Sequence, residues 1–217
     1  MCISILKGKV RYMTTKERIL DEALTLFSEK GYANVYVNDI AERVGIKAPS
    51  LYKHYKRKQA IFDAILEVMY GRFKETAGSF NIAGDDADKD AAIYTKMSEA
   101  NLIELGRNLF LYYLHDSYTK RFRKMLTIEQ FRDKELSSVY AKQYFDDPLS
   151  YQGMLFGLLV QNGILATDNV PIMTLHFYAP IYTLLTVCDR DPSREEECLK
   201  LLEEHIIKFD ELYGRGK

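Results

Sequence analysis

Several features that mark other classes of protein are scarce in this sequence. It has only 5 Pro and 12 Gly in 217 residues, and no segment is repeated or of low complexity. The 3 Cys are odd in number and widely spaced, so they form no disulfide framework, and a reducing cytoplasm is expected. Hydrophobic residues make up 47% of the chain and charged residues 28%. This balance excludes a disordered chain and indicates a soluble protein with a substantial core.

No segment is predicted to cross a membrane or to direct secretion. The most apolar stretch, 171–187, is too short for a bilayer span and contains His176 and Pro180. At the N-terminus a short apolar patch precedes the basic residues, whereas a secretory signal has the opposite order. Residues 1–13 lack any regular pattern, and we expect them to be a poorly ordered extension.

Helical periodicity dominates the rest of the chain and predicts an all-α fold. Thr14 and Glu17 form a capping box that opens the first helix, and Gly31 ends it. Asp147 and Pro148 mark another expected helix start. The later helices are expected at 37–44, 48–55, 58–80, 89–115, 118–131, 133–145, 149–163, 171–189 and 193–213.

The segment 37–56 is predicted to be a helix-turn-helix motif. Its first helix has a small buried side, Gly45 supplies a left-handed turn, and Pro49 lies in the first turn of the second helix. Leu51 and Tyr55 point inward at four-residue spacing and leave polar residues outside. Two short helices that share a core in this way present the second helix to the DNA major groove. A helix pair with no DNA role is the alternative for so short a pattern.

The distribution of charge supports the DNA-binding interpretation. Residues 1–65 carry 12 Lys and Arg against 7 Asp and Glu, a net charge of +5, within a chain whose net charge is −1. A basic run, 53–58, follows the second helix of the motif, where DNA phosphates are expected to pass.

Residues 16–66 resemble the DNA-binding domain of the TetR/AcrR family. The resemblance is carried by LFSEKGY at the end of the first helix, then DIAERVGI, then APSLYKHYKRKQAIFDAIL, in the family's order and spacing. It covers about a quarter of the chain. Tyr36, Lys47 and Arg57 depart from the pattern, each replacing a small polar cap worth about 1 kcal/mol.

The motif and the resemblance together yield a set of predicted DNA-contacting residues. Residues near 47–53 are expected to read bases, and the resemblance implies phosphate contacts from further positions. The full set is Tyr36, Lys47, Ala48, Pro49, Ser50, Tyr52, Lys53, His54, Tyr55 and Lys58.

For the rest of the chain the resemblance implies a division into a helix-turn-helix domain over 14–60 and a helical ligand-binding and dimerisation domain over 61–217. Aromatic and Met residues of the middle helices suggest an effector pocket, although ordinary core packing is the alternative for each. Its expected lining is Met97, Glu104, Arg107, Phe110, Tyr113, Met125, Phe131, Tyr144, Tyr151, Gln152 and Phe156. The last two helices are expected to dimerise through Phe177, Ile181, Leu184, Leu185, Leu202, Ile206 and Phe209.

The sequence therefore predicts a cytoplasmic homodimer that binds a palindromic operator in double-stranded DNA and regulates transcription. The resemblance implies a repressor that a small apolar or aromatic effector releases, with helix 58–80 carrying the change. A DNA-binding protein of this fold without an effector is the alternative. An enzyme is a remote alternative, because no catalytic motif is found and Cys198 with His205 falls short of a site. We predict no metal and no cofactor.

Overall fold

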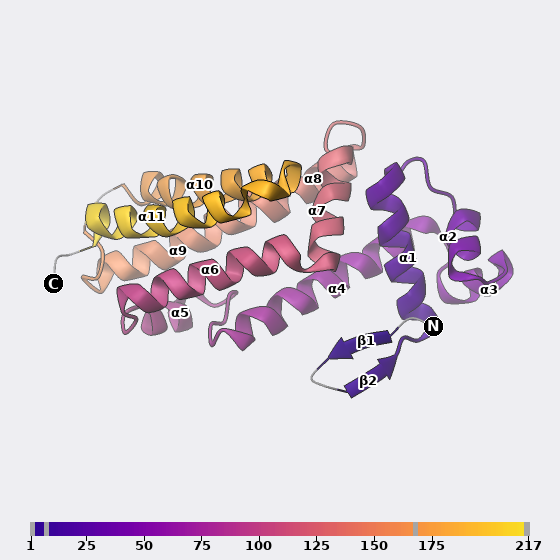
Figure 1. The fold of residues 1–217 in the computed structure, drawn as a ribbon, viewed down its shortest axis with the longest axis horizontal. Helices are drawn as coiled ribbons and strands as arrows, with labels where there is room; N and C mark the ends of the chain where they lie inside the picture. Colours follow the sequence, from indigo (N-terminus) through magenta and orange to yellow (C-terminus); the bar gives the residue numbers. More distant parts are fainter. Residues whose placement is uncertain (1–2, 7–8, 167–168, 215–217) are drawn as a thin grey trace. The chain divides into compact units, whose positions relative to one another are not determined.

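The structure is a computed structural model that describes residues 3–6, 9–166 and 169–214, and side chains from residue 12 onward (Figure 1). Helices form most of it, which confirms the all-α prediction. Two short strands, β1 (Ile3–Leu6) and β2 (Lys9–Tyr12), precede the helices. These are α1 (Thr15–Lys30), α2 (Val37–Val44), α3 (Ala48–His54), α4 (Lys58–Ser79), α5 (Ala87–Tyr94), α6 (Glu99–His115), α7 (Ser117–Glu129), α8 (Lys134–Ala141), α9 (Asp147–Gln161), α10 (Val170–Arg190) and α11 (Glu195–Tyr213).

The strand pair was not predicted. β1 and β2 are antiparallel, with Ile3 opposite Tyr12 and Leu6 opposite Lys9. Both strands fall inside the expected extension, 1–13, whose poor order stays a prediction.

The chain divides into two compact units, which we call the head and the body. The head comprises Met1–Arg72 and Ser117–Ser138, and the body comprises Phe73–Asp116 and Val139–Lys217. This division differs from the predicted ranges 14–60 and 61–217. Residues 61–72 and 117–138 pack with the N-terminal helices, because their apolar side chains complete a core that α1 to α3 are too small to close.

The core of the head is built around α1. Thr14 caps this helix with the predicted capping box, in which its hydroxyl accepts from the Glu17 N–H at 3.2 Å. Apolar residues at helical spacing along α1 are fully buried. Helices α2, α3, α4 and α7 and the loop before α2 supply the rest of this core. The buried side chains of the head include Ile19, Ala23, Phe27, Val35, Ile40, Val44, Leu51, Ile61, Phe62, Ile65, Phe122, Met125 and Leu126.

The end of α1 leaves no room for a side chain at Gly31. This residue has φ 83°, which L residues rarely adopt, and a β-carbon there would collide with the buried carboxylate of Glu129 on α7. Backbone strain alone costs about 1–3 kcal/mol. We expect Gly31→Ala to lower the free energy of unfolding of the head by more than this, because the collision with Glu129 adds to the strain. Gly45→Ala is the control, because Gly45 also has a positive φ but open space around it. Equal losses of unfolding free energy in urea titrations of the two variants contradict this account.

The body is a helical bundle whose boundaries differ from two predictions. The predicted helix 89–115 is broken, because the chain turns between α5 and α6 at Ser98, whose hydroxyl caps α6. Helix α9 begins at Asp147 with Pro148 in its first turn, as predicted, but the expected break before it is absent. A π-helical segment, Lys142–Asp146, instead joins α8 to α9 without a break. Pro148, in the first turn of α9, has no N–H to continue this bonding, and the π-helical segment lies directly before it.

The apolar helix α10 is longer than expected. It spans 21 residues, so by length and composition alone it could cross a membrane, and the argument that it is too short was wrong. Helices at the core of water-soluble proteins can meet the same criterion. Here α10 packs against α6, α9 and α11, and the absence of a membrane role stays a prediction.

Candidate nucleic-acid interface

Helices α2 and α3 form the predicted helix-turn-helix geometry. Gly45 adopts a left-handed conformation (φ 77°, ψ 34°), and the N–H of Ile46 donates to the Ala41 carbonyl at 2.9 Å. Leu51 of α3 is fully buried, while Pro49 occupies the first turn. The short buried face of α3 leaves its N-terminal residues outward, as a recognition helix requires.

Most of the predicted DNA-contacting side chains are exposed on α3 or beside it. Tyr36 and Tyr52 are 71% and 42% exposed, which is unusual for such large rings and leaves them free to contact DNA. Ala48 is half-buried. The other exposed members of the set are Lys47, Pro49, Ser50, Lys53 and His54.

Two residues of this set take part in the packing and bonding of the head itself. The side chain of Tyr55 is 6% exposed, and burial, followed by the nearby Glu67, raises the pKa of its hydroxyl to about 12. The ammonium of Lys58 donates to the carbonyl oxygens of Tyr32 at 2.7 Å and Val35 at 3.0 Å. Desolvation lowers the pKa of Lys58, against the opposing charge of nearby carboxylates. The buried Tyr55 is therefore corrected as a predicted DNA contact. Lys58 ties the loop before α2 to α4 and is half-buried, so its contact with DNA stays a prediction.

Lys56 and Arg57, which lie outside the predicted set, are two further cations beside α3. Both are exposed between α3 and α4, so the positive charge beside the recognition helix persists. The basic run 53–58 was the sequence signal for them, although it could not separate the exposed cations from the half-buried Lys58.

The unusual cap of α2 is compensated from within the helix. Tyr36 stands at the N-cap, and its backbone N–H donates to the carboxylate of Asp39 at 2.7 Å. Asp39 therefore supplies half of a capping box, and the ring of Tyr36 stays exposed.

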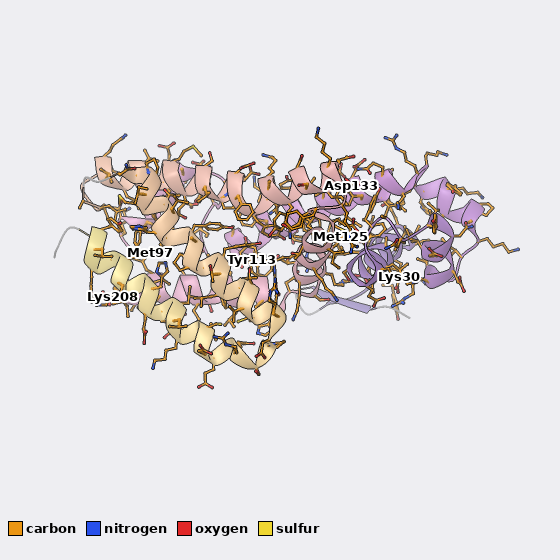
Figure 2. The ribbon with its side chains drawn as sticks, turned by 90° about the horizontal axis from the view of Figure 1, so that it is seen from above. Lys30, Met97, Tyr113, Met125, Asp133 and Lys208 are labelled. Atoms are coloured by element: carbon orange, nitrogen blue, oxygen red, sulfur yellow. The ribbon has the colours of Figure 1, made fainter. Side chains whose placement is uncertain are left out.

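The predicted effector-pocket residues do not gather around one cavity among the described residues. Met125 is buried in the core of the head, and Phe131 is 92% exposed at the turn after α7. Met97 precedes the start of α6 and Tyr113 lies near its end, so most of the length of this helix separates them (Figure 2).

The remaining members of the predicted pocket are mostly engaged in packing or polar contacts. Phe110 and Phe156 belong to the body core, where the Phe156 ring stacks on Phe209. The exposed Arg107 pairs with Glu203 on α11 at 2.6 Å. Glu104 is exposed, and Tyr113 and Gln152 are half-buried. Tyr144 is buried, and the Tyr151 hydroxyl donates to Asp90. The packing alternative therefore describes most of these side chains.

The predicted dimer residues face mainly inward. Leu185, Leu202, Ile206 and Phe209 are between 1% and 8% exposed, in the core of a single chain. Phe177, Ile181 and Leu184 are half-buried against that core. The exposed apolar residues of α10 and α11 are different ones: Ile172, Leu175, Leu201 and Leu212.

A hollow lies along the exposed side of α10 and α11. It has a volume of about 350 Å³, and Leu175, His176, Leu212 and Tyr213 are among its lining residues. A second hollow of about 630 Å³, between α9 and α10, shares Leu175 with the first. Leu175 therefore stands between two depressions on an apolar face.

Cys198 and His205, which the sequence analysis judged too few for a site, have separate partners. The thiols of Cys198 and Cys188 are buried and hydrogen-bonded to each other, and burial raises the pKa of Cys188 to about 12. His205 instead bonds the Phe177 carbonyl through Nε2 at 2.9 Å. Across the part of the chain that the structure describes, no three His, Cys, Asp or Glu side chains are placed to hold a metal ion.

Comparison with known proteins agrees with the geometry of the head. Residues 19–65 match the family model of bacterial regulatory proteins, tetR family. A stretch of 58 residues is 45% identical to the biofilm operon icaADBC HTH-type negative transcriptional regulator IcaR of Staphylococcus epidermidis. It covers 27% of this chain and 31% of that protein, so the chain matches about a third of that relative's length.

Solved structures match the fold of the whole chain. SmeT, the repressor of the Stenotrophomonas maltophilia multidrug efflux pump SmeDEF, aligns over 94% of this chain and 92% of its own, with a TM-score of 0.63 and 20% identity. SmeT has also been solved as a complex with triclosan. A TetR transcription regulator from Haloarcula marismortui aligns over 93% and 98%, with a TM-score of 0.65 and 14% identity.

The fold and the exposed recognition helix define a helix-turn-helix protein with a helical C-terminal body. Residues 19–65 carry the tetR-family match, and the fold of the chain is that of solved TetR-family regulators.

Proposed function

We propose that the protein is a homodimeric transcriptional repressor that binds a palindromic operator through α3. The observation that carries the proposal is the exposed N-terminal half of the recognition helix. Lys47, Ser50 and Lys53 lie outward there, beside the exposed ring of Tyr52. Lysine ammonium groups bind phosphates, and serine hydroxyls can read base edges in the major groove.

We propose a second copy of the chain as the partner on the face of α10 and α11. Four exposed aliphatic side chains on two adjacent helices are costly to leave in water, and two hollows beside Leu175 can receive side chains from a partner. A dimer also fits two half-sites about 34–36 Å apart. A cytoplasmic location agrees with contact with the chromosome.

The proposed effector binds in the body. A small apolar or aromatic molecule is suggested by the triclosan complex of SmeT, a structural neighbour. Binding in the body is expected to favour a state in which the recognition helices no longer fit the operator. The test is thermal stabilisation of the protein by members of a library of small aromatic molecules. If no member stabilises it, the alternative of a DNA-binding protein of this fold without an effector is favoured.

DNA binding is tested with duplexes selected from a random library by the purified protein. The affinity of wild type is expected to fall steeply between about 50 and 200 mM salt, because bound phosphates release counterions. Lys47→Ala with Lys53→Ala should bind more weakly, and each lost phosphate contact should reduce the salt slope by about one.

The matched control is Lys96→Ala with Lys200→Ala, which removes two exposed lysines of the body. Its affinity and salt slope should equal those of wild type. If wild type selects no sequence and shows no salt-dependent binding to any duplex, the proposed function is wrong. An equal loss in both variants would instead place the DNA contacts elsewhere.

A further inference from the structure

A single arginine on α7 holds α1 from the side. The guanidinium of Arg121 donates from Nη1 to the Asp21 carbonyl at 3.0 Å and to the Thr25 hydroxyl at 2.5 Å. Its Nη2 donates to the Asp21 carboxylate at 2.6 Å, and its Nε to the Ser117 carbonyl of its own helix at 3.1 Å. A planar fork bonded in this way fixes both the position and the rotation of α1 against α7.

The residues of α1 beside Asp21 hold the helix-turn-helix. Arg18 donates through Nη2 to the carbonyl of Val44, the last residue of α2, at 2.5 Å. Glu22 accepts from Nε of Arg43, also near the end of α2, at 3.0 Å. The turn at Gly45 follows directly. A shift of α1 therefore moves the end of α2 and, with it, the start of the recognition helix.

Two further contacts join the segment 117–138 to the N-terminal helices of the head. The carboxylate of Glu129, at the end of α7, is buried against Gly31, where α1 ends. The carboxylate of Glu135 on α8 accepts from Gln59, at the start of α4, at 2.9 Å. Together with Arg121, these residues of segment 117–138 contact α1 at its middle and at its end. They also contact the first turn of α4.

The chain passes between body and head a second time at residues 116–117, directly before Arg121 and its contacts. Residues 73–116 belong to the body, and the chain enters the head again at Ser117, whose carbonyl oxygen bonds Arg121. Helix α4 is thus not the sole covalent connection between body and head. A displacement of the chain at residues 116–117 reaches Asp21 through one helical turn of α7.

We propose that Arg121 is a positioning residue of the DNA-binding head, and that through Asp21 and Thr25 it holds the recognition helix in its binding orientation. This inference rests on the proposed function. Arg121 lies on α7, not on the DNA-binding face, so it acts on the fit of two recognition helices to two half-sites and not on the number of phosphates bound.

The test uses the full-length protein and its selected operator, with duplexes in which one base pair is inserted or deleted between the half-sites. Wild type should prefer one spacing. Arg121→Met should bind that spacing about tenfold more weakly and lose much of the preference, because an intermediate contact of this kind alters coupling several-fold. Its salt slope should match that of wild type. Adding Asp21→Ala to Arg121→Met should cost nothing more, because the contact is already lost.

Arg107→Met is the matched control, because it removes an ion pair of the same length within the body. It should leave affinity and spacing preference unchanged. Arg121→Lys keeps the positive charge facing Asp21 but lacks the planar guanidinium that bonds several acceptors at once. It is the second variant to measure if Arg121→Met does not fold. A folded Arg121→Met or Arg121→Lys protein with the affinity and spacing preference of wild type overturns the inference. Absence of DNA binding by wild type overturns the proposed function first, and the inference with it.

Discussion

Leu175→Asp combined with Leu212→Asp is expected to give a monomer that binds the operator at least about 100-fold more weakly than wild type. Leu175 is 46% exposed on α10 and Leu212 is 70% exposed on α11, and both line one hollow. A monomer reaches one half-site at a time, so it loses the high effective concentration that a second tethered head provides. In a dimer interface the two carboxylates are buried without partners, which opposes association strongly.

Light scattering of the purified variant gives its mass, and fluorescence anisotropy gives its affinity for the selected duplex. The control, Thr95→Asp with Ser98→Asp, adds the same two charges at exposed positions between α5 and α6. It should remain a dimer with unchanged affinity. A dimeric Leu175→Asp/Leu212→Asp protein would show that copies associate through another face.

The second large effect is expected at Asp90, which is fully buried on α5. Its carboxylate accepts from the backbone N–H groups of Ala83 at 2.7 Å and Gly84 at 2.8 Å, and from the hydroxyl of Tyr151. Burial and this bond to Asp90 both raise the pKa of Tyr151. Asp90→Ala leaves these three donors unpaired, and we expect it to lower the free energy of unfolding of the body by about 3 kcal/mol or more.

Asp88→Ala is the control, because Asp88 lies on the same helix and is exposed. It should change stability by less than about 0.5 kcal/mol. Hydrogen exchange locates the effect, since the amides of Ala83 and Gly84 should lose protection in Asp90→Ala alone. Retained protection of these amides in Asp90→Ala would mean that Asp90 does not hold the loop.

Asp90 also shows what a linear pattern does not reveal. It lies at the start of the predicted helix 89–115, shortly after three other aspartates, Asp85, Asp86 and Asp88. Its burial depends on Tyr151, 61 residues later in the chain. No local property of the sequence distinguishes the one buried carboxylate in this run from its exposed neighbours.

The same limit explains the correction at the DNA-binding head. Tyr55 and Lys58 belong to the family motif, yet one completes the core and the other bonds two backbone carbonyl oxygens of the loop before α2. The motif pattern does not distinguish residues that pack within the domain from residues that contact DNA. The structure separates them by exposure.

The apolar stripes of the body were found correctly, but their partners were not. Leu202 and Ile206 form an amphipathic stripe that could equally well face a second copy or the chain's own core. In the structure they pack with Phe110 and Cys188 of the same chain. The face left for a partner holds Leu175 and Leu212, which the helical stripe alone did not indicate.

The sequence by itself determined the helical class, the first helix with its capping box, and the helix-turn-helix with its glycine turn and exposed basic residues. These features depend on residues within a few positions of one another, so helical period, capping and turn chemistry are sufficient to predict them. Only the tertiary structure decided that α7 belongs to the head, that Asp90 is buried, and which apolar residues remain exposed. Each of these depends on contacts between residues that are tens of positions apart, and their burial follows from how whole helices pack, not from any local preference.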